Sequence, residues 1–278
     1  MLNLEKLSTE ARNPASSRID KLDTLSMMRV MNDEDQKTAL AVKAILPDIA
    51  RAVDVIAARL KTGGRLFYMG SGTSGRLGIL DAVECPPTYS TDPDLVQGLI
   101  AGGKEAIFRA REGAEDSLDK GADDIISHDL SAKDVLVGIT ASGRTPYVLG
   151  GMEEARRRGA FVIGLACSKE PDIACTADLM LICLHGPEVV TGSTRMKAGT
   201  VTKMILNMLS TGTMIRLGKV RGNLMIDVKA TNEKLKERAT RIVMTVTGMD
   251  RAAAEKALRE SDGRARLAVE RWEASHDS

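Results

Sequence analysis

The chain has 278 residues, a formal net charge of +1, 43% hydrophobic residues and 28% charged residues. This length and composition are typical of a globular protein with one large domain and a smaller one. The near-neutral charge and an aromatic content of 3% argue against nucleic acid or an anionic membrane as partner. No apolar run could span a bilayer and no signal-peptide core is visible, so we expect a cytoplasmic protein.

The cysteines and histidines give no sign of a metal centre. The four cysteines form no C-x-x-C pair, and His128, His185 and His276 lack metal-ligand spacing. We therefore expect reduced, mostly buried thiols rather than disulfides or a zinc site. The prediction is chemistry that needs neither a metal nor a cofactor.

Helical periodicity dominates the N-terminal part of the chain. Between Asp35 and Leu60 the apolar residues follow the helix period, and Pro47 predicts that a second helix starts inside this run. Short apolar segments then alternate with amphipathic helices, which predicts an α/β fold with a parallel sheet covered on both faces. The predicted strands are Leu66–Met69, Leu95–Ile100, Val135–Ile139, Phe161–Ala166 and Leu179–Cys183.

The last third of the chain reads as helical throughout. A long Met-rich segment from Ser193 to Leu217 is expected to pack a core or a dimer interface. A second helix follows from about Lys229 to Val246, and two short amphipathic patterns, separated by Gly263, complete the tail. Together these resemble a ubiquitin-associated-type unit of three helices.

A glycine-rich turn, Gly70-Ser71-Gly72-Thr73-Ser74-Gly75, joins the first predicted strand to a helix. Its glycines satisfy the dinucleotide pattern, but the next strand runs into Ala101-Gly102-Gly103 instead of the acidic residue that a ribose needs. A P-loop is excluded because no Gly-Lys-Ser/Thr follows. The hydroxyls of Ser71, Thr73 and Ser74 add donors to the helix N-terminus and favour a phosphate monoester over a turn without ligand.

Two further hydroxyl clusters follow. Ser142, Arg144 and Thr145 come after the third predicted strand, where an ordinary helix cap is the alternative interpretation. Because parallel strands end at one edge of a sheet, this turn and the first should face one crevice. Thr191–Lys197 opens the long helix, and its two cations, Arg195 and Lys197, make a bound anion a reasonable explanation against the alternative of a solvated face.

Two carboxylates stand near these turns. Glu84 is expected to end the first crossover helix, just before Cys85-Pro86-Pro87, and Glu115 to lie in a turn between two helical stretches. Most glutamates are surface residues, so spacing alone does not make either catalytic. Two carboxylates beside one phosphate site would suit acid–base work if their environments separate their pKa values.

At this point the motifs resemble a known family. The first two turns are similar to those of the sugar isomerase (SIS) domain, a flavodoxin-like fold. Within that superfamily nearly the whole chain resembles the N-acetylmuramic acid 6-phosphate etherases, lyases of bacterial cell-wall recycling. The stretches that carry this resemblance are Thr9–Ser16, Gly70–Tyr89, Glu112–Asp116, Ala141–Pro146, Thr191–Gly199 and Ala230–Leu235.

The resemblance implies cleavage of a D-lactyl ether on an amino-sugar phosphate, with Glu84 as proton donor and Glu115 as the second acid–base residue. It also implies a homodimer. We expect phosphate and sugar contacts from the three hydroxyl clusters, and our hypothesis is that the Thr9–Ser16 arm completes the site of the partner. The expected contact residues are Ser71, Thr73, Ser74, Ser142, Arg144, Thr145, Ser193, Thr194 and Lys197.

The expected domain organisation is an N-terminal helical arm (1–54), a SIS domain with a five-stranded parallel sheet (55–228) and a small C-terminal helical segment (229–278). Two alternatives stay open. An aldose–ketose isomerase of the same fold would use a similar phosphate site. A sugar-phosphate sensor without activity is the other, although the helix-turn-helix and basic patch of a DNA-binding regulator are missing from the sequence.

Overall fold

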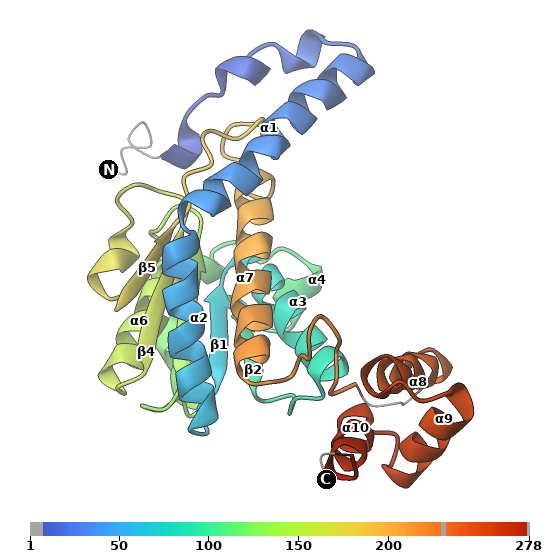
Figure 1. Ribbon diagram of the computed structural model, residues 1–278. Coiled ribbons are helices and arrows are strands. Elements are labelled where there is room, and N and C mark those ends of the chain that lie inside the picture. Colours follow the sequence, from blue (N-terminus) through green and yellow to red (C-terminus); the bar gives the residue numbers. More distant parts are fainter. Residues whose placement is uncertain (1–7, 229–231, 277–278) are drawn as a thin grey trace. The chain divides into compact units, whose positions relative to one another are not determined.

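The computed structural model describes residues 8–228 and 232–276, which alternate between strands and helices before ending in helices (Figure 1). The strands are β1 (Leu66–Gly70), β2 (Val96–Ile100), β3 (Val135–Thr140), β4 (Phe161–Ala166) and β5 (Leu179–Ile182). The α-helices are α1 (Thr24–Ala44), α2 (Leu46–Lys61), α3 (Gly72–Tyr89), α4 (Glu105–Phe108), α5 (Leu118–Ser127), α6 (Pro146–Arg157), α7 (Lys197–Arg216), α8 (Glu233–Thr247), α9 (Arg251–Glu260) and α10 (Ala265–Ala274). Short 3₁₀ turns are η2 (Ser8–Glu10), η3 (Pro14–Ser16), η4 (Ile19–Lys21), η5 (Ala114–Asp116) and η6 (Asp172–Cys175).

The five strands form one parallel sheet in the order β2-β1-β3-β4-β5, as the alternating pattern predicts. This is the doubly wound order of flavodoxin, in which the chain changes direction across the sheet between β1 and β3. Ligands of such sheets bind outside the carboxyl ends of the strands at that switch point. The strand order therefore predicts a ligand site at the turns after β1 and β3.

Helices cover both faces of the sheet. On one face α5 and α6 bury Phe67, Met69 and Leu136 in the main core. On the other face Tyr68 packs against Gly78 of α3, and Figure 1 shows α2 and α7 crossing the sheet. Strands β1 and β3 are buried along their whole length, which is why they read as continuous apolar runs in the sequence.

The chain divides into two compact units. The first comprises the described residues as far as Val83 together with Asp94–Thr211, and it contains the whole sheet. The second comprises Glu84–Pro93 and the described residues from Gly212 onward. In the second unit α8, α9 and α10 surround their own apolar core, which includes Ala239, Val243 and Val269. The boundaries 1–54, 55–228 and 229–278 stay a prediction.

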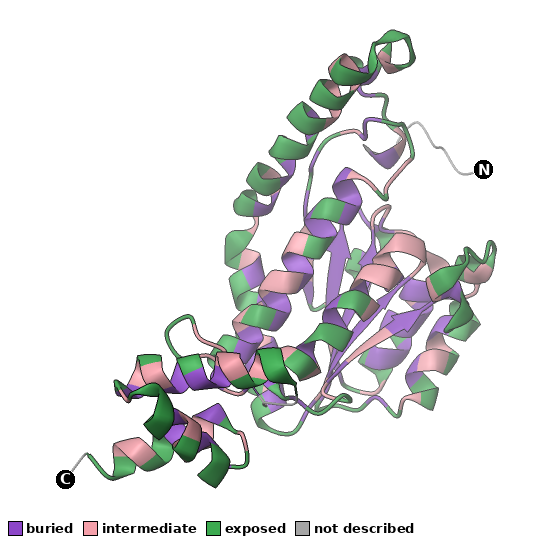
Figure 2. Ribbon diagram, turned by 90° about the vertical axis from the view of Figure 1, so that its right-hand side faces the viewer, coloured by how far each residue is buried: buried purple, intermediate pink, exposed green. Residues whose placement is uncertain are grey.

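Helix α1 is held by a narrow stripe of contacts. Only Glu34, Thr38 and Val42 of this helix are buried, four residues apart along one face. Figure 2 shows the remainder of α1 as mostly exposed. Asn13 and Ser16, in the segment before α1, donate side-chain hydrogen bonds to the carbonyls of Pro187 and Val189. The predicted break is confirmed, since α1 ends at Ala44 and α2 has Pro47 in its first turn.

One expected helix end is wrong. Glu84 does not end α3, because the helix continues through Pro86 and Pro87 to Tyr89. The fixed φ of proline is compatible with helix, and two adjacent prolines in the last turns remove only two backbone donors. The amide of Ser90 still donates to the carbonyl of Pro86 at 2.9 Å. Glu84 therefore lies within a helix rather than at its end.

Candidate functional site

The turn between β1 and α3 is tight enough to require glycine. A Cβ atom on Gly70 would lie 2.7 Å from the amide nitrogen of Gly75, and one on Gly75 would lie 2.6 Å from Cγ1 of Ile100. Gly72, with φ of +53°, adopts the left-handed conformation. The glycines thus bring the start of α3 against the end of β1, where its backbone N–H groups can reach an anion.

The hydroxyl groups of this turn are available for a ligand. Ser71, Thr73 and Ser74 are all half-buried, and within residues 8–228 and 232–276 none of these hydroxyls has a hydrogen-bond partner. Three unpaired hydroxyls at a helix N-terminus match the donor set that a phosphate monoester needs.

A cavity of about 180 Å³ opens beside the first turn. The Arg76 guanidinium donates to the carbonyls of Ile107 and Ala106 at 2.9 and 2.8 Å, which ties α4 to α3. Glu115 lies in η5, in the predicted turn between helical stretches, and is exposed on the cavity wall. The polar wall residues are Ser71, Arg76, Arg111, Glu112 and Glu115. A carboxylate and the first hydroxyl turn therefore share one hollow.

The turn after β3 carries a connected set of hydroxyls. The Thr140 hydroxyl lies 2.8 Å from that of Thr145 and 3.3 Å from that of Ser142. The Arg144 side chain lies close to a carboxylate, with its Nε 3.4 Å from Oδ1 of Asp172. Ser142, Arg144 and Thr145 are half-buried. The loop is thus held in shape by its own polar groups.

The three clusters meet at the switch point of the sheet. β1 and β3 are direct neighbours, with Gly70 opposite Ile139, so the two turns after them are adjacent. A Cβ atom on Gly199, in the first turn of α7, would lie 3.4 Å from Cγ2 of Thr73. The two turns and the start of α7 therefore lie close together, and their forming one crevice stays a prediction.

The N-terminus of α7 already has an anion. Glu188 accepts hydrogen bonds from the backbone N–H groups of Lys197 and Ala198, both at 2.8 Å. A carboxylate at this position interacts favourably with the helix dipole. Ser193 and Thr194 precede this cap and are half-buried, and their contact with a substrate stays a prediction.

The side chain of Lys197 is fully buried in an ion pair with α1. Its Nζ donates to Oε2 of Glu34 at 2.6 Å and to the carbonyl of His185 at 3.1 Å. Burial alone would raise the pKa of Glu34, but hydrogen bonds from Lys197 and Lys37 lower it to about 2. Burial also lowers the pKa of His185. Lys197 thus joins α7 to α1, and its contact with a substrate stays a prediction.

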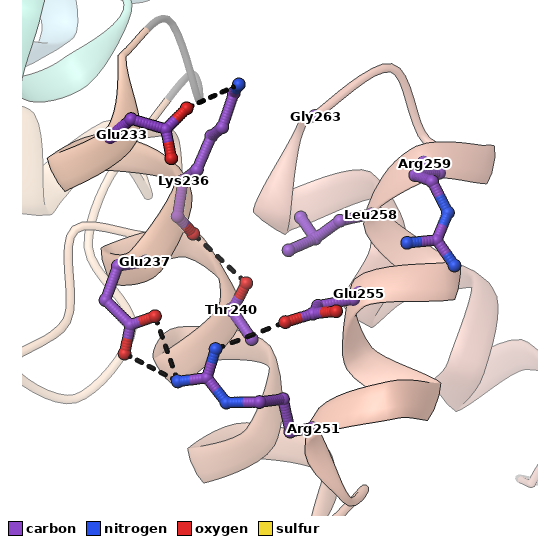
Figure 3. A pocket seen from close by; sticks show the side chains of 9 residues that line it. All are labelled: Glu233, Lys236, Glu237, Thr240, Arg251, Glu255, Leu258, Arg259 and Gly263. Carbon is purple, nitrogen blue, oxygen red and sulfur yellow. Dashed lines mark hydrogen bonds and ion pairs between the residues drawn. The ribbon is translucent and has the colours of Figure 1, made fainter.

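Glu84 belongs to the second unit and is exposed on α3. The same unit contains a cavity of about 400 Å³ between α8 and α9 (Figure 3). There Arg251 donates to both carboxylate oxygens of Glu237 and to Glu255, so opposite charges on the wall are paired with each other.

Neither a metal-ligand cluster nor a membrane-spanning helix is found among the described residues. Within the described ranges no three His, Cys, Asp or Glu side chains gather in a group that could hold a metal ion. None of the described helices combines the length and apolar character that a membrane span requires.

Close relatives identify the chain. It is 58% identical to the N-acetylmuramic acid 6-phosphate etherase of Aeromonas hydrophila, over 96% of this chain and 90% of that relative. The chain belongs to the N-acetylmuramic acid 6-phosphate etherase family. The etherase of Clostridium beijerinckii is 54% identical over 96% of this chain and 88% of its own length. N-acetylmuramic acid 6-phosphate etherase 2 of Vibrio parahaemolyticus is 57% identical over 96% of this chain and 89% of its own length.

Domain and structure comparisons agree with the fold of the etherase family. Residues 48–156 match the N-terminal SIS domain of glucokinase regulatory protein, and residues 222–264 match its C-terminal lid domain. An E. coli CFT073 protein solved in complex with a ligand is similar with a TM-score of 0.51 and 16% identity, covering 73% of this chain and 97% of that one. A phosphoheptose isomerase from Francisella tularensis is similar with a TM-score of 0.50 and 18% identity. The match covers 69% of this chain and 98% of the isomerase. The SIS prediction is confirmed.

Sequence reasoning missed several charged residues that the structure places in the cavity wall or around the start of α7. It assigned no role to Arg76 or Arg111, although the first follows the glycine turn and the second precedes the Glu112–Asp116 stretch. It also missed that Glu188 caps α7 and that Glu34 pairs with Lys197. The one available signal for Glu34 is its position on the stripe of α1 that also contains Thr38 and Val42.

Proposed function

We propose that this chain cleaves the D-lactyl ether of N-acetylmuramic acid 6-phosphate and releases N-acetylglucosamine 6-phosphate and D-lactate. Relatives at 54–58% identity over 96% of the chain are N-acetylmuramic acid 6-phosphate etherases, carbon–oxygen lyases of amino-sugar metabolism. The observation that carries the proposal within the structure is the cavity that Ser71 and Glu115 share, because it unites hydroxyl donors for a sugar phosphate with a carboxylate for proton transfer.

The phosphate is assigned to the turns at the switch point. Ser71, Thr73 and Ser74 supply unpaired hydroxyls, and the start of α3 supplies backbone N–H groups. Ser142 and Thr145 of the neighbouring turn extend this donor set toward the sugar, and Arg144 adds a positive charge there. Ser193 and Thr194, which precede α7, extend the proposed site. Lys197 supports it indirectly, because its buried ion pair with Glu34 holds the start of α7 against α1.

The reaction divides into proton transfers that two carboxylates can perform. Opening of the sugar ring exposes an aldehyde at C1, which acidifies the proton on C2. One glutamate removes that proton while a protonated carboxyl group gives a proton to the departing ether oxygen at C3, so the C3–O bond breaks and D-lactate leaves. Water then adds to the unsaturated intermediate. We assign these proton transfers to Glu84 and Glu115, with Glu84 as the proton donor.

The assembly proposed for the chain is a cytoplasmic homodimer. Leu25, Met28 and Leu40 of α1 are 60%, 45% and 67% exposed, although all three are large apolar side chains. Large apolar side chains that their own chain leaves uncovered support a second copy as the partner of this helix. In this proposal the Thr9–Ser16 arm completes the site of the partner. Light scattering of the full chain tests for the dimer, and an arm-truncated chain that keeps both the dimer and full activity would contradict the role of the arm.

The experiment is an assay of D-lactate and N-acetylglucosamine 6-phosphate released from N-acetylmuramic acid 6-phosphate, with and without EDTA. General acid–base catalysis contributes about 10²- to 10⁴-fold, so Glu84→Gln and Glu115→Gln should each lose that much in kcat. Glu105→Gln, an exposed glutamate on α4 outside the cavity wall, is the matched control and should keep full activity. We expect EDTA to change nothing.

Two outcomes would contradict the proposal. Pure, folded protein that binds the phosphosugar but releases no D-lactate is not an etherase, and conversion of a phosphosugar to its ketose would make it an isomerase. Full activity of both glutamine variants would remove the two carboxylates from the mechanism.

A further inference from the structure

The proposed substrate carries two anions, and the switch-point turns account for only one of them. The phosphate is assigned to the hydroxyl turns after β1 and β3, which leaves the carboxylate of the lactyl group. A carboxylate entering a cavity that already holds Glu112 and Glu115 meets like charges, which disfavour it unless a cation lies beside it.

The cations near this site differ in how far they are already engaged. Arg76 lines the cavity but uses two of its N–H groups on the carbonyls of Ala106 and Ile107. Lys197 forms a buried ion pair with Glu34, and Arg144 forms an ion pair with Asp172. These three positive charges therefore already have partners within the chain, and Arg195, which is exposed just before α7, does not line the cavity.

Arg111 is different. It lines the cavity together with Ser71 and Glu115, it is exposed, and within the described residues its guanidinium has no hydrogen bond or ion pair. Its backbone lies close to the turn after β2, because a Cβ atom on Gly102 would lie 3.3 Å from Cβ of Arg111. The residue thus starts beside the end of the edge strand, while its charged group has no partner among the described residues.

We propose that Arg111 binds the carboxylate of the lactyl group and so makes the site specific for an acidic ether. The planar guanidinium of arginine matches a carboxylate with two parallel N–H···O bonds, which lysine cannot reproduce. In this position it also offsets the repulsion between the substrate carboxylate and Glu115, and it holds the leaving group while the C3–O bond breaks. This inference rests on the proposed etherase function and adds the residue that selects its substrate.

The test compares two substrates that differ only in charge at the lactyl group. One is N-acetylmuramic acid 6-phosphate, and the other is its lactyl carboxamide, which is nearly isosteric and neutral. Release of N-acetylglucosamine 6-phosphate is measured for both with wild type, Arg111→Gln and Arg109→Gln. Arg109 is a matched control, since it is an exposed arginine of the same segment that does not line the cavity.

A charge-assisted hydrogen-bonded pair predicts a specific loss. For Arg111→Gln, kcat/KM should fall about 10- to 100-fold with the acidic substrate and less than about twofold with the carboxamide. Arg109→Gln should change neither. Wild type should prefer the acidic substrate, and Arg111→Gln should nearly abolish that preference.

The other results separate the two proposals. An equal loss with both substrates would mean that Arg111 acts on the phosphate or on the fold, and it would overturn the assignment while leaving the etherase function in place. An unchanged kcat/KM in Arg111→Gln would also overturn it. Wild type that cleaves neither substrate would refute the etherase function and, with it, this inference.

Discussion

The buried ion pair between Glu34 and Lys197 gives a quantitative prediction about stability. The two side chains are only 4% and 1% exposed, and the two residues, which lie 163 positions apart along the chain, join α1 to α7. Replacing Glu34 by Gln leaves a buried ammonium whose other acceptor is the carbonyl of His185. Removing one partner of such a pair costs about 3–5 kcal/mol, so Glu34→Gln should lower the free energy of unfolding by that amount.

The reverse change should cost less. In Lys197→Met the carboxylate of Glu34 keeps its second cation, Lys37, which is more than half exposed. We therefore expect Lys197→Met to be milder than Glu34→Gln, and the double variant Glu34→Leu with Lys197→Met to recover part of the loss because no buried charge remains. An asymmetry of this kind would not follow from a simple loss of packing.

Urea unfolding followed by far-UV circular dichroism measures these differences, with the slope against urea checked for each variant. Tryptophan fluorescence is unsuitable, because the single tryptophan, Trp272, lies on α10 in the second unit. The control is Arg51→Ala, which removes an exposed pair with Asp48 on α2 and should cost at most about 1 kcal/mol. A loss below about 1 kcal/mol for Glu34→Gln would refute the reasoning.

Three further outcomes are expected. In the folded chain the pKa of Glu34 is lowered from 4.5 to about 2, so the stability that its ionised form provides is complete above pH 4.5 and is lost as the pH falls toward 2. The free energies of unfolding of wild type and Glu34→Gln should therefore converge between pH 4.5 and pH 2. A difference that stays constant over this range would contradict the prediction. Gly75→Ala should destabilise the chain by about 1–3 kcal/mol and weaken phosphosugar binding in calorimetry, because its Cβ would press on Ile100, and unchanged binding would mean that the turn is not the phosphate site. Of the four thiols only Cys175 is exposed, so one equivalent of a thiol reagent should react quickly in native protein, while burial, which raises the pKa of Cys183 to about 11, keeps that thiol slow; two fast equivalents would contradict the structure.

Local patterns were sufficient for the elements and for the first turn of the site. All five strands were predicted to within one residue at each end, and the central strands β1 and β3, which are buried on both faces, appear as uninterrupted apolar runs. The break at Pro47 and the glycine turn were predictable for the same reason, because a missing donor and a positive φ are properties of single residues. The end of α3 was not predictable in this way, because proline commonly ends a helix, whereas the fixed φ of Pro86 and Pro87 is compatible with this one, which continues to Tyr89.

By itself, the sequence determined the order of strands and helices, the three hydroxyl clusters and the family. Only the tertiary structure decided which charges are paired and which are free. Lys197 and Arg111 look alike in the sequence, yet one is buried on Glu34 and the other stands unpaired, within the described residues, on a cavity wall. The physical reason is that the partner of a charged side chain comes from a segment that only the fold brings close. The spacing of residues along the sequence does not show which distant segment that is.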